Sequence, residues 1–504
     1  MFEGILEALV IISNPVVVGI VLLGSLIGFV FGIIPGLSSI TALVISLPFS
    51  LYLDPKIAMY FYAGIMGASA FGGSVPAILI RVPGTGVNVA TTFDGYPMTQ
   101  RGEGSLALGI AAMASLLGAM FGIVVLVAAL PLLKAMVMTM GPPEFLMLVI
   151  WGLMAVIVLS GGNLLKGLLS ACLGLAFSLF GATPVTTAYR WGFGTNYLTY
   201  TPGLPMIPVI LGLFAIGQMI KLAVTGKIVT DEKAMVIGSY WQSTLGGLKE
   251  IFKHKLCFFR SATIGTIVGI IPGIGGVAAT YFSYMAAMQS SKEPERFGKG
   301  HPEGVIASEA SNDAKDGGAL LTTVAFGVPG SIVMAVLLGA LVMHGLTPGP
   351  LLIRNHPDII WALIFGLLIS NFLVSTVGLL IATKMSVIAR VKTTYLIPIV
   401  VVTCFIGVFM NSKNVVDIFV AIAFGFLSFG MEKYGLPLVP LAIAFVLGRL
   451  GEVFFHQSLQ IAWGSYSIFF TRPISLALFI LIVIIFALPY LAPLLTKRRR
   501  IVKS

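Results

Sequence analysis

Long apolar runs with almost no charge recur along the chain and are separated by short polar segments. Examples are residues 106–133, 145–160, 359–383 and 474–491, and a helix that crosses a bilayer needs about 20 such residues. The runs are continuous rather than alternating, which argues against a transmembrane β-barrel. The pattern therefore predicts an all-α, polytopic membrane protein with about ten to twelve spanning helices, some of them broken or re-entrant.

Composition and charge sharpen this prediction. Hydrophobic residues make up 58% of the chain and charged residues 10%, so there is too little polar surface to cover a soluble globule. The net charge of +11 comes from basic residues between the spans, mainly in 221–260, and from Lys497 to Arg500 at the end. This distribution is typical of cytoplasmic loops beside an anionic leaflet. We therefore expect a lipid bilayer as the partner, no nucleic acid, and a cytoplasmic C-terminus.

Three motifs occur twice, in the same order. GIIPG stands at 32–36 and 269–273, and in both places it is preceded by a glycine that completes GxxxG. The other two motifs are VPG followed by Thr or Ser, at 82–85 and 328–331, and GLPxxP, at 203–208 and 435–440. Ordered matches at similar separations indicate an internal duplication.

The duplication predicts the organisation of the chain. Residues 1–224 form a first repeat, 225–255 a basic cytoplasmic linker, 256–473 a second repeat, and 474–504 a last transmembrane helix with a basic tail. The loop near Lys134 has fewer basic residues than its counterpart around Lys384 to Lys392, which favours inverted repeats. Parallel repeats remain open.

Each Pro-Gly pair is expected to break a membrane helix, which leaves backbone groups without partners unless they bind something. A helix that starts after such a break presents free N–H groups and a positive dipole end to an anion. Paired breaks in two halves are the best sequence pointer to a transporter binding site. The predicted substrate contacts are Pro35, Gly36, Ser38, Ser39, Gly84, Thr85, Asn88, Pro272, Gly273, Gly275, Gly276, Gly330 and Ser331.

Hydroxyl, amide and carboxyl groups near the second motif suit a coupling cation or a proton. The candidates for this ion site, with Na⁺ as the possible metal and no other cofactor, are Thr91, Asp94, Asn312 and Thr322. Asp94 equally suits the cap of a turn. The polar stretch 290–316 fits a solvated loop and helix, but Asn312 and Lys315 also share a helical face that could line the pathway.

Structural interpretations stand beside these functional ones. GxxxG usually marks close helix packing, which we expect at Gly28, Gly32, Gly265 and Gly269. Pro and Gly can also mark simple kinks. HExxH, GxSxG and Walker A motifs are absent from the sequence, so no catalytic residue is predicted. An intramembrane enzyme acting on a lipid or a peptide is the alternative function, and it requires a pair such as Asp94 and Glu309 around a cleft.

The chain resembles the large membrane subunit of the tripartite tricarboxylate transporters. The resemblance rests on GIIPG, on 72–79 running into 82–85, on the DGYP of 94–97, on the loop 297–305, and on 327–331 followed by 344–350. Where the family tends toward a neutral stretch, residues 309–316 carry added charges.

That resemblance implies more than the residues do. It implies a subunit of a secondary transporter in the bacterial inner membrane that imports a di- or tricarboxylate with Na⁺ or H⁺. It also implies a small membrane subunit of about four spans and a periplasmic solute-binding protein as partners.

Overall fold

The computed structural model describes residues 2–159, 163–183, 188–192, 203–225, 240–272, 275–385, 393–484 and 486. In this part of the chain seven helices are long and apolar enough to cross a membrane, and five shorter apolar helices of 10–17 residues accompany them. The regular secondary structure of these described residues is helical apart from one pair of short antiparallel strands. The prediction of an all-α polytopic membrane protein is confirmed.

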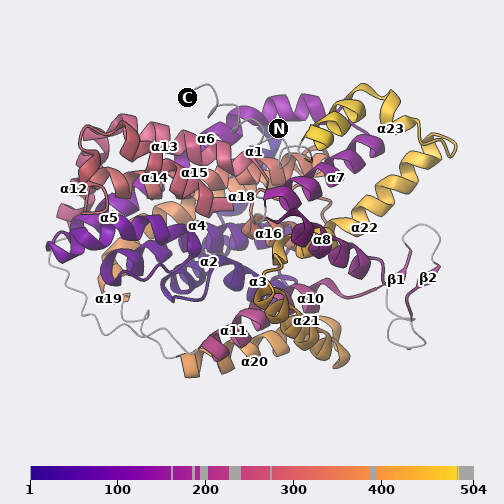
Figure 1. Ribbon diagram of the computed structural model, residues 1–504, viewed down its shortest axis with the longest axis horizontal. Helices are drawn as coiled ribbons and strands as arrows, with labels where there is room; N and C mark the ends of the chain where they lie inside the picture. The colour runs from indigo at the N-terminus through magenta and orange to yellow at the C-terminus, as the bar shows by residue number, and fades with distance from the viewer. Residues whose placement is uncertain are drawn as a thin grey trace, which may run out of the picture.

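The elements follow one another with short connections (Figure 1). The first group is α1 (Phe2–Ile12), α2 (Pro15–Ile33), α3 (Ser39–Ser50), α4 (Pro55–Ile80), η1 (Gly86–Asn88), α5 (Val89–Gln100), α6 (Gly104–Val137), α7 (Pro142–Leu159), α8 (Leu164–Ser178), β1 (Gly181–Ala182), β2 (Tyr189–Arg190), α10 (Met206–Leu211), η2 (Gly212–Ile216) and α11 (Gly217–Thr225). The second is α12 (Tyr240–Lys253), α13 (Lys255–Ile270), α14 (Gly275–Ser290), η3 (Pro294–Arg296), α15 (Pro302–Phe326), α16 (Ile332–Met343), α17 (Pro350–Asn355), α18 (Pro357–Leu373), η4 (Val374–Gly378), α19 (Leu379–Met385), α20 (Thr393–Ser412), α21 (Val416–Lys433), α22 (Leu438–Ile461), α23 (Ile468–Thr471) and an unlabelled helix, Pro473–Ile484.

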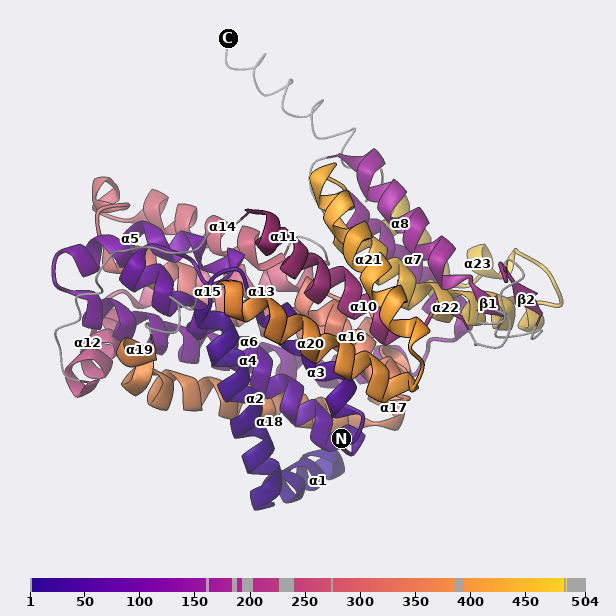
Figure 2. The ribbon, with the colours of Figure 1, turned by 90° about the horizontal axis from the view of Figure 1, so that it is seen from below.

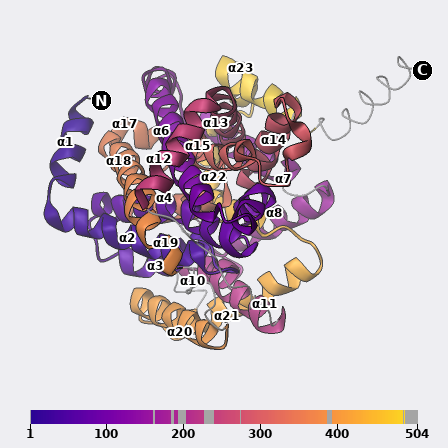
Figure 3. The same cartoon turned by 90° about the vertical axis from the view of Figure 1, so that its left-hand side faces the viewer.

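The molecule is elongated. Helices α5, α12 and α19 lie toward one end, and α7, α8, α22 and α23 lie toward the other (Figures 1 and 2). Along the long axis, α4 and α15 are surrounded by other helices (Figure 3). Helix α4 packs on α2 and α18, and α15 packs on α13 and α6. Each of these two central helices therefore contacts one helix of its own half and one helix of the other half.

Glycines bring the paired helices into backbone contact. A β-carbon at Gly28 would overlap the carbonyl oxygen of Ile65, and one at Gly32 would lie 2.6 Å from that of Ser69, both on α4. In the second half, β-carbons at Gly265 and Gly269 would overlap the backbone of α15. The packing role expected for the GxxxG glycines is confirmed.

The two GIIPG motifs end their helices in the same way. Ile34, which follows α2, has φ −78° and ψ 111°, and Ile271, which follows α13, has φ −86° and ψ 110°. The chain then begins a new helix at Ser39 and at Gly275 respectively. Both predicted breaks are present. These matched breaks support the division into repeats 1–224 and 256–473, which we retain as a proposal.

Several predicted features lie outside the described residues. They are Gly273, residues 226–239 of the linker, residue 485 and the tail 487–504.

Replacing Gly28 with Ala tests the backbone contact. The new methyl group must push α2 away from Ile65, and overpacking of this kind costs about 1–3 kcal/mol. Gly19→Ala is the matched control, because Gly19 lies on the same helix with nothing within 4 Å of its would-be β-carbon. Thermal unfolding in detergent should show a lower Tm for Gly28→Ala and an unchanged or higher Tm for Gly19→Ala. Equal Tm values would contradict the contact.

Candidate functional site

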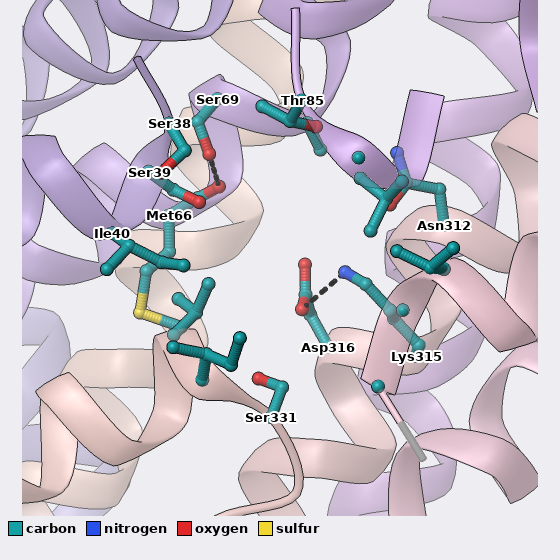
Figure 4. Close-up of a pocket in the computed structure, with 18 of the residues that line it drawn as sticks. Ser38, Ser39, Ile40, Met66, Ser69, Thr85, Asn312, Lys315, Asp316 and Ser331 are labelled. Carbon is teal, nitrogen blue, oxygen red and sulfur yellow. Dashed lines mark hydrogen bonds and ion pairs between the residues drawn. The ribbon is translucent and has the colours of Figure 1, made fainter. Parts of the chain in front are cut away.

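A cavity of ≈ 480 Å³ lies where the two halves meet. Its wall combines hydroxyl groups, small residues, an apolar side and one pair of opposite charges (Figure 4). The lining residues are Ser38, Ser39, Ile40, Met66, Ser69, Ala70, Thr85, Gly86, Val87, Val156, Gly275, Gly276, Val277, Asn312, Lys315, Asp316, Pro329, Ser331, Ile332, Val333, Val439 and Ile443.

Four helical segments begin at this cavity. Ser38 and Ser331 are the N-caps of α3 and α16, and their backbones match closely, with φ −151° and ψ 171° against φ −151° and ψ 170°. Thr85 is the N-cap of η1, which continues directly into α5, and α14 begins at Gly275. All four residues line the cavity. The first N–H groups of a helix lack partners within it and carry the positive end of its dipole, so the convergence favours an anionic ligand.

One ion pair projects into the cavity from α15. The Nζ of Lys315 lies 2.8 Å from Oδ1 of Asp316, and both charged groups point toward the centre (Figure 4). A β-carbon at Gly276 would overlap the side-chain carbons of Lys315. Glycine at this position therefore lets the lysine stem pass over the first turn of α14.

Asn312 lies one helical turn before this pair and also lines the cavity. Its side chain is fully buried, and neither the oxygen nor the nitrogen of its amide has a hydrogen-bond partner among the described residues. A buried polar atom without a partner costs about 1–3 kcal/mol. This amide is consequently a strong candidate to contact a ligand or an ion.

A hydrogen-bond network supports the cavity from behind. Asn88 donates to the carbonyl oxygen of Ala70 at 3.1 Å and to Oγ of Ser74 at 2.8 Å, and it accepts from Thr85. Ser74 in turn donates to the buried carboxyl of Glu309 at 2.7 Å. Asn88 thus positions Thr85 rather than lining the cavity, and the network ties α4 to α15.

Asp94 lies outside the cavity lining and holds a loop. Its Oδ1 accepts from the backbone N–H groups of Gly300 at 2.8 Å and His301 at 2.7 Å, and its Oδ2 accepts from the hydroxyl of Tyr284 at 2.7 Å. Nδ1 of His301 accepts from the backbone N–H of Glu303, and burial lowers the pKa of this imidazole. These contacts hold the segment that leads into α15. Asp94 therefore anchors residues far away in the sequence, in addition to any local turn.

The structure brings together about half of the predicted substrate contacts. Six of them line the cavity, and so does Asn312 from the predicted ion site. The six are Ser38, Ser39, Thr85, Gly275, Gly276 and Ser331. Gly36 and Gly84 line an adjoining pocket of ≈ 350 Å³ that shares Ser38 and Thr85 with the cavity.

The other predicted residues have structural contacts. A β-carbon at Gly84 would overlap the carbonyl oxygen of Gly32, and one at Gly330 would lie 2.5 Å from that of Gly269. Each VPG turn is therefore packed onto the GIIPG break of its own half. Pro35 and Pro272 stand in the breaks themselves without lining the cavity. Thr322 and Thr91 donate to Ala319 and Glu309 respectively.

Sequence reasoning missed part of the wall. Asp316 is absent from the predicted contacts, and Lys315 is predicted only as part of a helical face that could line the pathway; the added charges in 309–316 are the signal for both. Val156, Val439 and Ile443 had no signal, because apolar residues of a membrane helix look alike whether they face lipid or a ligand.

The chain is similar to proteins of a known family. The family model described as "Tripartite tricarboxylate transporter TctA family" matches residues 18–443. An uncharacterized 52.8 kDa protein in the TAR-I ttuC' 3' region of Agrobacterium vitis is 30% identical over 456 residues, which cover 90% of this chain and 89% of that protein. An uncharacterized protein in the TAR-II ttuC' 3' region of the same organism is 30% identical over 237 residues, 47% of this chain and 98% of that protein. No solved structure gives a significant match.

Asp94→Ala tests the anchoring role of this carboxylate. The change removes three hydrogen bonds to a charged acceptor, each worth about 1.5–3 kcal/mol, so we expect a large fall in Tm. Tyr284→Phe removes one of the three and should lower the Tm less. If Asp94→Ala keeps its Tm and instead alters the dependence of uptake on Na⁺ or H⁺, Asp94 is an ion ligand and the anchoring role is wrong.

Proposed function

Because the chain belongs to the tripartite tricarboxylate transporter TctA family, we propose that it is the large membrane subunit of a secondary transporter that imports a small carboxylate. A periplasmic solute-binding protein delivers the substrate, and a gradient of Na⁺ or H⁺ drives uptake. The family and the multi-pass membrane architecture supply the general assignment. The substrate, the ion and the direction are the proposal.

The observation that carries this proposal is the convergence of four helix starts on one cavity. Ser38, Thr85, Gly275 and Ser331 come from breaks in both halves, so the cavity needs both halves to exist. Lys315 adds a cationic side chain to the four partial charges, and in this structure it is paired with Asp316. A carboxylate is the common small anion whose two oxygens can accept from several such donors.

For the coupling cation we propose Asn312 as a ligand. Of the four predicted residues it is the one that lines the cavity, and its buried carbonyl oxygen has no partner among the described residues. An amide oxygen suits Na⁺. Thr91, Asp94 and Thr322 already form the hydrogen bonds described above, so they contribute to such a site only indirectly.

The remaining parts of the assignment follow the family. We propose that the protein lies in the bacterial inner membrane with its C-terminus in the cytoplasm, and that a small membrane subunit of about four spans accompanies it. Substrate would then pass from the binding protein into the cavity by alternating access, with the segments around the breaks moving against a scaffold of other helices.

The alternative of an intramembrane enzyme finds no support in the described residues. Glu309 accepts from Ser74 and Thr91, whereas Asp94 accepts from Tyr284 and the loop at Gly300. Neither carboxyl lines the cavity. The family is a transporter family, which points away from an enzyme.

Uptake by the reconstituted complex tests the proposed function. The protein, its small subunit and the binding protein are combined in proteoliposomes, and labelled carboxylates are followed under an imposed Na⁺ or H⁺ gradient. We expect accumulation of at least one carboxylate that disappears when the gradient is collapsed. Absence of uptake across a broad panel of mono-, di- and tricarboxylates and amino carboxylates, with each component folded, would refute the proposal.

Gly276→Ala tests whether the position of Lys315 over the first turn of α14 matters for substrate binding. The new methyl group overlaps the stem of Lys315, a flexible side chain that can move aside, and lies 2.7 Å from a methyl carbon of Val87, which must shift slightly. We expect KM for uptake to rise about tenfold, equivalent to about 1.4 kcal/mol, with little change in Tm. Gly19→Ala, away from any neighbour, should leave KM unchanged. An unchanged KM in Gly276→Ala would show that the position of Lys315 does not matter.

A further inference from the structure

The charged residues of the cavity indicate which kind of carboxylate it can bind. This inference rests on the proposed function. Among the described residues that line the cavity, Lys315 is the one base and Asp316 the one acid. Their side chains are 11% and 14% exposed. The full charges of the wall therefore sum to zero, and the helix starts add a local preference for one anionic group.

A substrate with two or three carboxylates fits this wall poorly. One carboxylate can lie at the helix starts and Lys315. A second one in the same small cavity has no further cationic side chain among the described residues and lies near the carboxylate of Asp316. Unpaired like charges away from water are strongly unfavourable.

Asp316 itself requires a partner once substrate is bound. The described residues give its carboxylate one hydrogen bond, from Lys315. If a substrate carboxylate draws Lys315 away, Asp316 remains largely buried and has lost that bond. Breaking a buried pair in this way is costly unless a new donor takes over, and a cationic N–H group on the substrate is the partner that restores the balance.

The remaining wall is apolar. Met66, Val156, Val333, Val439 and Ile443 face the cavity, and such a surface stabilises the hydrocarbon part of a ligand rather than additional charges. We propose that the substrate is a small amino carboxylate. Its carboxylate lies at the helix starts and Lys315, its ammonium group at Asp316, and its hydrocarbon part against the apolar wall.

Binding of matched ligand pairs to the purified full-length protein with its small subunit tests this proposal. Each pair is an amino acid and the carboxylate that lacks only its amino group, for example valine and isovalerate, with aliphatic, aromatic, hydroxylated and ω-amino members. Succinate and citrate represent several carboxylates. Measuring binding without the soluble binding protein keeps the selectivity of that protein out of the result.

The wild type should bind the amino member of at least one pair at least tenfold more tightly than its partner. Asp316→Asn should reduce this preference to less than threefold, and Asp316→Glu should retain it. Glu103→Gln is the control, because Glu103 pairs with Arg101 at 2.7 Å on the exposed surface, and it should leave the preference unchanged. If Asp316→Asn does not fold, the wild-type preference for amino ligands over their partners without the amino group is the deciding result.

Two results would overturn the inference and leave the proposed function standing. One is tighter binding of succinate, citrate or the members without an amino group. The other is an Asp316→Asn variant that loses Na⁺ dependence with unchanged ligand preference, since Asp316 would then hold the coupling ion. If no ligand of either class binds and none is taken up by the complete transporter, the proposed function itself fails.

Discussion

Direct backbone contact at glycine is the constraint on which the rest of the structure depends. Gly28 and Gly32 let α2 touch α4, and Gly265 and Gly269 let α13 touch α15. Membrane helices gain no hydrophobic stabilisation from leaving lipid, so close packing at small residues is a main source of their association.

The same contacts also support the breaks. Each VPG turn packs its glycine on the carbonyl of the last GxxxG glycine, Gly84 on Gly32 and Gly330 on Gly269. Irregular backbone at membrane depth is tolerated where protein covers it or where it lines a cavity. Here one side of each break is covered by glycine contact, and the other side opens the helix starts at Ser38 and Gly275 toward the cavity.

Much of this arrangement could be predicted from the sequence, because Pro and Gly act locally. The repeated motifs gave the position of both breaks, the helix starts after them and six of the cavity residues. What the sequence could not supply is which neighbour each polar group meets. Asp94 carries the same carboxylate whether it binds an ion or anchors Gly300 and His301, and Val439 looks the same facing lipid or a cavity. Both outcomes depend on tertiary contacts, and those of Asp94 join residues more than 200 positions apart in the chain.

The two sides of the cavity hold a ligand by different physical means. On the side of α15, direction matters: Asn312, Lys315 and Asp316 project from one helix, and Glu309 on the same helix is hydrogen-bonded to Ser74 of α4. A group bound there is fixed in angle and distance. On the side of α7 and α22, Val156 and Ile443 offer non-directional contact that excludes water and sets no orientation. Together with the donors at the four helix starts, α15 therefore supplies the directional contacts that can distinguish chemically similar anions.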